Sequence, residues 1–112
     1  MENCLFCRIS NGEIPADIVY QSDDFLAFSD IAPQAPIHVV VIPRAHINSI
    51  MDPTDSSLMG SLLLAVQHVA SLLRVDRDGF RTVINCGENG GQTVNHLHVH
   101  LLGGRFMQWP PG

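Results

Sequence analysis

The chain has 112 residues, 46% of them hydrophobic and 15% charged, and a formal net charge of −5. These values exclude an intrinsically disordered chain and predict a single domain, residues 1–112, with its own hydrophobic core. Only six residues are Lys or Arg, and they form no basic cluster, which argues against a nucleic-acid partner.

No apolar stretch reaches the roughly 18 residues that a membrane span needs. The first residues, MENCLFCRISNGEIP, lack the basic start and the apolar stretch of a secretion signal. The three cysteines are an odd number, which fits a reducing compartment better than a framework of disulfides. We therefore expect a cytoplasmic protein without a membrane partner.

The first predicted elements are β-strands. Residues 18–20 and 25–28 are β-prone runs on either side of a polar stretch, which predicts a hairpin. Residues 32–36 (APQAP) form a turn or a crossing segment. Residues 37–42 (IHVVVI) are the strongest predicted strand. Pro43 ends it, because proline has no N–H for a ladder hydrogen bond.

One long helix is predicted from about residue 53 to about residue 74. Asp52 and Pro53 are typical of a helix start, as cap and first helical residue. Apolar residues then recur at helical spacing, namely Leu58, Leu62, Val66, Val69 and Leu73. Two more strands follow, over residues 80–85 and over a histidine-rich run. This order of elements indicates an α+β domain with an antiparallel sheet.

Residues 96–101 (HLHVHL) hold three of the six histidines. On a strand, His96, His98 and His100 share one face, and the apolar residues between them can pack against the helix. Three interpretations compete. The row is a polar sheet face without a function, a metal site in which strand histidines chelate zinc, or a nucleophilic site in which a neutral imidazole attacks a centre such as phosphorus.

The loop before this row favours nucleophilic chemistry. Residues 87–92 are rich in glycine, so backbone N–H groups can turn toward an anion. Asn85 and Thr93 add side-chain donors nearby. A glycine-rich turn between two strands is also common without any ligand, so this signal is weak when taken alone.

Cys4 and Cys7 form a Cys-x-x-Cys pair, which is typical of a metal clamp or a redox pair. A redox pair usually lies in a thioredoxin-like unit, which this order of elements does not supply. Zinc needs four ligands and the pair supplies two. Two buried free thiols are the alternative.

The run HLHVHLL (residues 96–102) matches the signature His-φ-His-φ-His-φ-φ of the histidine triad superfamily, where φ is apolar. The segments GEIPADIVY, LAFSDIAPQAPIHVVVIPRAHI, NCGENGGQTVNH and LLGGRFMQWPPG resemble its nucleotide-binding branch. The resemblance implies the histidine triad fold, an antiparallel sheet with one long and one short helix. It also implies a two-fold homodimer whose sheet continues across the subunits.

The resemblance implies hydrolysis of purine nucleoside phosphoramidates or aminoacyl-adenylates, with release of AMP or GMP and no cofactor needed for catalysis. His98 corresponds to the nucleophile, which forms a covalent nucleotidyl-histidine. Its other ring nitrogen would donate to the backbone carbonyl of His96. His100 contacts the phosphate and assists the leaving group, and His38 lies beside the nucleophile. The choice between adenine and guanine stays open.

The resemblance also places residues around the nucleotide. Asn85, Gly91, Gln92 and Thr93 would surround the α-phosphate together with His98 and His100, and Thr93 keeps the hydroxyl of the serine found in most relatives. Asp30 would accept from both ribose hydroxyls. From the sequence alone, Asp30 can equally be a turn cap.

The expected walls of the base pocket are Phe6, Ile9, Phe28 and Ile31, which without the resemblance would all be assigned to the core. Trp109, in the tail MQWPPG, corresponds to a residue that reaches the partner subunit's site near the leaving group. Ordinary interface packing is the alternative for Trp109. The long helix would pair with its symmetry mate.

Some superfamily members, including galactose-phosphate uridylyltransferases, carry zinc on a similar cysteine pair. The matching ligands here are Cys4, Cys7, His46 and His96, which implies one structural Zn²⁺ per subunit. Cys86 is expected to be a small packing residue. Two other functions stay open: a nucleotide-binding adaptor with incidental hydrolysis, and a zinc-dependent hydrolase that uses the histidine row as ligands.

Overall fold

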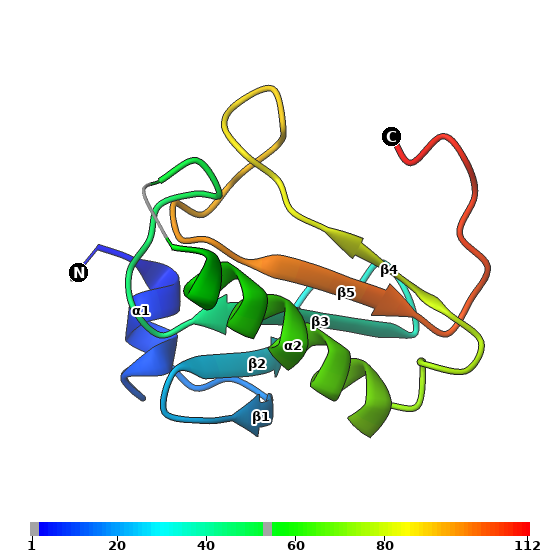
Figure 1. Cartoon of the computed structure of the whole chain (residues 1–112), viewed down its shortest axis with the longest axis horizontal. Helices are drawn as coiled ribbons and strands as arrows, with labels where there is room; N and C mark the ends of the chain where they lie inside the picture. Colours follow the sequence, from blue (N-terminus) through cyan, green and yellow to red (C-terminus); the bar gives the residue numbers. More distant parts are fainter. Residues whose placement is uncertain (1–2, 53–54) are drawn as a thin grey trace.

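The computed structural model describes residues 3–52 and 55–112. Five strands form one antiparallel sheet in the order β1-β2-β3-β5-β4 (Figure 1). The strands are β1 (Ile18–Gln21), β2 (Phe25–Ser29), β3 (Ile37–Pro43), β4 (Phe80–Val83) and β5 (Val99–Gly103), and the helices are α1 (Leu5–Ser10) and α2 (Ser56–Leu72). The predicted α+β class, with one long and one short helix, is confirmed.

The long helix α2 lies across one face of the sheet, against β2, β3 and β5, while α1 lies at one end of the sheet (Figure 1). Neighbouring residues of a strand therefore enter different clusters. Val39 and Val41 pack with the buried side of α2, whereas Val40 and Ile42 pack with Phe6 of α1. The predicted hairpin and the predicted strand over residues 37–42 are both present.

The long helix begins later than expected. Asp55 is the cap, and its carboxylate accepts a hydrogen bond from Leu58 N–H at 2.8 Å. Asp52 instead accepts from Asn48 N–H at 2.7 Å and closes a loop before the helix, so its prediction as the cap is wrong. The predicted role of Pro53 falls on a residue outside the described ranges. The helix ends at Leu72, and Arg74 adopts a left-handed φ of 61°.

The last two strands are shorter than predicted. The pairing of Val41 with Val99 would place Pro43 opposite Leu97, and proline cannot donate to that ladder. Leu97 N–H donates to Ile47 at 2.6 Å instead, so β5 begins only at Val99. β4 ends at Val83. In the two described ranges, no helix is long and apolar enough to cross a membrane.

Candidate active site and metal cluster

The alternation predicted for the histidine row holds, although only His100 lies within β5. Leu97, Val99 and Leu101 are buried in the cluster that α2 covers. His100 pairs with Val40 of β3, a residue of the opposite face. The histidines thus lie on the face away from the long helix. His96 and His98 precede the regular strand, and both are buried.

One ring nitrogen of His98 forms a hydrogen bond with the backbone. Its Nδ1 lies 2.6 Å from the carbonyl oxygen of His96, as expected from the resemblance. A carbonyl oxygen only accepts, so Nδ1 carries the hydrogen and the neutral ring keeps a lone pair on Nε2. The ring of Phe6 meets the His98 ring edge to face, with centroids 5.1 Å apart. These two contacts thus fix the orientation of the His98 ring.

His38 and His100 form a second pair beside it. His38 Nε2 lies 2.9 Å from His100 Nδ1, and the backbone N–H of Gln34 donates to His38 Nδ1 at 3.0 Å. The rings of His98 and His100 have centroids 5.0 Å apart. The structure therefore gathers His38, His98 and His100 into one site. Burial, followed by the neighbouring His98 and His38, lowers the pKa of His100.

Asp30 faces the same pair of histidines. One carboxylate oxygen, Oδ2, lies 3.5 Å from His38 Nε2 and 4.0 Å from His100 Nδ1. The other oxygen accepts from Ala32 N–H at 2.8 Å, so Asp30 does cap the turn that follows it. Asp30 thus belongs to the histidine site, and its exposed fraction of 22% leaves it open to a ligand.

The glycine-rich loop is closed by its own hydrogen bonds. Gly91 N–H donates to Glu88, Gln92 N–H donates to Gly87, and Gly87 N–H donates to the Gln92 side chain. Asn85 donates to the Gly90 carbonyl at 2.7 Å. The expected anion nest is therefore not formed by these three N–H groups, because each already has an acceptor within the loop.

The expected base-pocket residues divide into two groups. Phe6 and Phe28 are buried, with ring centroids 5.4 Å apart, and Ile9 packs against the same cluster. Ile31 is 100% exposed and Trp109 82% exposed, so neither belongs to a core of the single chain. Three of the four side chains expected around the base thus lie in one cluster, whereas Ile31 and Trp109 are exposed in the single chain.

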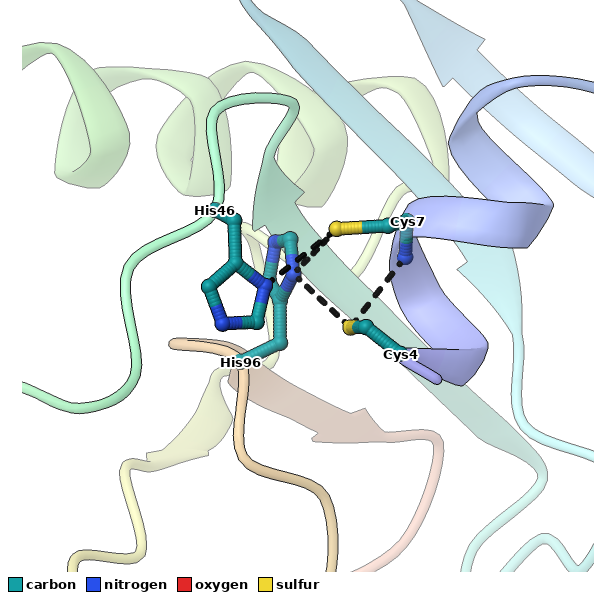
Figure 2. Close-up of side chains that lie close together, drawn as sticks. All are labelled: Cys4, Cys7, His46 and His96. Atoms are coloured by element: carbon teal, nitrogen blue, oxygen red, sulfur yellow. Dashed lines mark hydrogen bonds between the residues drawn. The ribbon is translucent and has the colours of Figure 1, made fainter. Parts of the chain in front are cut away.

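A second cluster brings together Cys4, Cys7, His46 and His96, whose ligand atoms all lie within 4.8 Å of one another. Figure 2 shows the two cysteines at the start of α1, facing the rings of His46 and His96. The Nδ1 of His46 lies 3.2 Å from Cys7 Sγ, and that of His96 lies 3.4 Å from Cys4 Sγ. This is the predicted ligand set, and it is a group that can hold a metal.

Both rings of this cluster are oriented by acceptors behind them. His96 Nε2 lies 2.7 Å from the Pro43 carbonyl, and His46 Nε2 lies 2.8 Å from Asn48 Oδ1. With hydrogens on these Nε2 atoms, both Nδ1 lone pairs point at the sulfurs. Burial lowers the pKa of His96 and, together with the Cys4 side chain, raises the pKa of the Cys7 thiol.

A comparison with known families and proteins identifies the domain. The model of the HIT domain matches residues 11–107. The chain belongs to the HIT family. An uncharacterized HIT-like protein of Synechococcus elongatus is 52% identical over 99% of this chain and 98% of its own length.

Solved HIT structures share the whole fold. A HIT family hydrolase from Legionella pneumophila is 48% identical, with a TM-score of 0.95 over 98% of this chain and 100% of its own. A histidine triad protein from Clostridium difficile is 40% identical, with a TM-score of 0.92 over 96% of each chain. The arrangement described above is therefore a HIT fold along nearly its full length.

Two residues that contact the site histidines were not predicted from the sequence. Gln34 acts through its backbone N–H, a group that every residue except proline has, so no side-chain pattern marks it. The Asn48 side chain accepts from His46, and the Asn48 backbone carbonyl accepts from Gln92 at 2.7 Å, which joins the cysteine–histidine cluster to the glycine-rich loop. A polar residue two positions after His46 was the available signal.

The lowered pKa of His100 predicts how stability depends on pH. The unfolded chain takes up a proton near the ordinary value of 6.5, whereas folded His100 resists it, so stability present above that pH is lost as the pH falls. Urea unfolding of metal-stripped protein at several pH values should give a free energy of unfolding that decreases as the pH falls. The His100→Gln variant should reduce this dependence on pH by at most about 1.4 kcal/mol per pH unit. An unchanged slope in His100→Gln would contradict the prediction.

Proposed function

We propose that this protein hydrolyses purine nucleoside phosphoramidates or aminoacyl-adenylates through a covalent nucleotidyl-histidine on His98 and releases AMP or GMP. The observation that carries this proposal is the hydrogen bond from His98 Nδ1–H to the His96 carbonyl, which leaves Nε2 with a free lone pair. The name of the Legionella relative, a HIT family hydrolase, supports the reaction class.

In the proposed first step, the His98 Nε2 lone pair attacks the α-phosphorus and the bond from phosphorus to the leaving group breaks. The leaving group takes a proton from His100, whose ring lies beside that of His98. In the second step, water attacks the phosphorus and returns a proton to His100, the bond to Nε2 breaks, and the nucleotide leaves. His98 directly precedes β5 and is oriented by its bond to the His96 carbonyl, while His100 lies within β5.

The nucleotide is proposed to lie along this histidine site. Phe6, Ile9, Phe28 and Ile31 would contact the base, and Asp30 would accept from the ribose hydroxyls. Asn85, Gly91, Gln92 and Thr93 are proposed to surround the phosphate with His98 and His100. Because loop hydrogen bonds already use N–H groups of Gly91 and Gln92, we expect phosphate binding to rearrange that loop.

The direct test is incubation with an adenosine phosphoramidate. We expect release of AMP, and after an acid quench we expect an intact mass raised by one adenylyl group. An adenosine analogue without the scissile bond should give no adduct. Binding of nucleotide without release of AMP would favour the adaptor function, and turnover without an adduct would remove the covalent mechanism.

We also propose that Cys4, Cys7, His46 and His96 hold one structural zinc ion per subunit. A tetrahedral Cys₂His₂ zinc site separates sulfur and nitrogen ligands by about 3.5 Å, given the usual bond lengths. The observed separations of 3.2 and 3.4 Å fit that geometry. The two outward Nε2 hydrogen bonds already select the tautomer that zinc needs.

A homodimer is the third part of the proposal. The long helix exposes Leu63 and Leu64 (53% and 64%), and the edge strand β4 exposes Phe80 (40%). Burial of these apolar side chains against a symmetry mate would cover both the helix and the open edge of the sheet. The partner subunit would then bring its Trp109 toward this site.

Leu64→Glu is expected to weaken this dimer by roughly 100-fold or more, because it places a charge within an apolar contact. Sedimentation equilibrium measures the change. Ile18→Glu is the control, because Ile18 is 40% exposed on β1, at the opposite edge of the sheet. A wild-type monomer, or equal association of both variants, would contradict the interface.

A further inference from the structure

The direction of the hydrogen bond between His38 and His100 is decided by a backbone group. Gln34 N–H can only donate, so His38 Nδ1 accepts and, in the neutral ring, the hydrogen lies on Nε2. His38 Nε2, which carries that hydrogen, lies 2.9 Å from His100 Nδ1 and 3.5 Å from Asp30 Oδ2, and both of these atoms can accept. His100 Nδ1 then holds a lone pair, and the His100 hydrogen lies on Nε2.

Gln34 is itself held by the segment that follows β5. Arg105 Nη2 donates to the Gln34 carbonyl at 2.9 Å. Gly104 permits this approach, because it has a φ of +88° and a Cβ there would lie 2.9 Å from the Pro36 side chain. The contact therefore ties the loop before β3 to the end of the strand that carries His100.

We propose that Gln34 and Arg105 are positioning residues that fix His100 with its hydrogen on Nε2, ready to protonate a leaving group. The chain of donors runs from Arg105 to Gln34, from Gln34 to His38, and from His38 to His100. The catalytic consequence rests on the proposed hydrolysis, whereas the tautomers can be measured without any substrate.

The same hydrogen keeps a metal ion away from this site. Asp30, His38 and His100 resemble a metal-binding triad, with ligand atoms within 4.8 Å of one another. His38 Nε2 carries a hydrogen, so it offers no lone pair to a metal. In the cysteine cluster the groups behind the rings are acceptors, and the lone pairs point inward. The cluster of Cys4, Cys7, His46 and His96 therefore presents lone pairs to a metal, whereas His38 in the other group does not.

Gln34→Pro tests the proposal because it removes the N–H, and Gln34→Ala is its matched control because it loses only the side-chain bond to Ala32. Long-range ¹H–¹⁵N spectra at a pH above the ordinary histidine range should show hydrogen on Nε2 of both His38 and His100 in the wild type and in Gln34→Ala. In Gln34→Pro we expect a mixture of tautomers. Unchanged tautomers in Gln34→Pro, or equal changes in both variants, would overturn the proposal.

Arg105→Met gives a second measurement that leaves the backbone of residue 34 intact. We expect kcat to fall about three-fold with an unchanged KM, and about ten-fold in Gln34→Pro. Arg105→Lys should restore most of the loss, since it keeps a charged donor. Arg8→Met is the control, because Arg8 is an exposed residue of α1 whose guanidinium pairs with Glu13 at 3.9 Å. Equal effects of Arg105→Met and Arg8→Met would overturn the role of Arg105.

Titration with Co²⁺ tests the exclusion of metal. The wild type should take one equivalent, with the thiolate-to-cobalt absorption of a cysteine site, and Gln34→Pro should take a second equivalent without added thiolate absorption. A wild type that binds the second Co²⁺ as tightly as Gln34→Pro would show that the hydrogen on His38 excludes nothing. If the wild type shows the expected tautomers but does not hydrolyse the phosphoramidate, the proposed function is wrong and the positioning role of Gln34 stands.

Discussion

His98→Ala is expected to lower kcat/KM for an adenosine phosphoramidate by roughly 10⁴-fold or more, because it removes the atom that forms the covalent bond. His98 is 4% exposed, and its ring packs edge to face against the rings of Phe6 and His100. Steady-state kinetics with the same substrate measures the loss.

His98→Asn separates the nucleophile from the packing. An asparagine amide can still donate to the His96 carbonyl, as His98 Nδ1 does at 2.6 Å, but it has no nucleophilic nitrogen. We expect the same loss of activity and no adduct in intact mass. His68→Ala is the control, because His68 is exposed on α2, away from the site, with its ring centroid 4.8 Å from that of Tyr20. Substantial activity in His98→Asn would sink the covalent mechanism.

Cys7→Ser is expected to abolish stoichiometric zinc binding and to lower the melting temperature by roughly 10 °C or more. The cluster joins α1, the segment after β3 and the segment before β5, and loss of its metal would cost about 2–4 kcal/mol of folding free energy. Native mass spectrometry and thermal unfolding measure the two effects. Cys86→Ser is the control, because Cys86 lies outside the cluster.

The same experiment separates two mechanisms. His96 contributes its ring to the cluster and its carbonyl to His98, so loss of zinc should weaken catalysis without abolishing it. A zinc-dependent hydrolase would lose all turnover on chelation at a temperature where the protein stays folded.

Asn48→Ala should lower zinc affinity by about 10–100-fold, because it removes the acceptor behind His46.

Prediction from sequence succeeded where a periodic pattern was strong. Alternation in residues 96–101 correctly placed Leu97, Val99 and Leu101 on the face that packs against the long helix. It failed at element ends. Asp52 and Asp55 are both suitable helix caps, and only the hydrogen bond to Leu58 distinguishes the one that is used. A carboxylate near a helix start has several donors within reach, and tertiary packing selects among them.

The candidate site divides in the same way. The sequence by itself determined which imidazoles share a face, because alternation along an extended chain is a local property. Tertiary structure decided what each imidazole can do, because the tautomers depend on backbone groups of Gln34, Pro43 and His96, which no side-chain pattern reveals. The cluster of Cys4, Cys7, His46 and His96 likewise needs α1 and two segments far apart in sequence to meet, and only packing brings their ligand atoms within 4.8 Å.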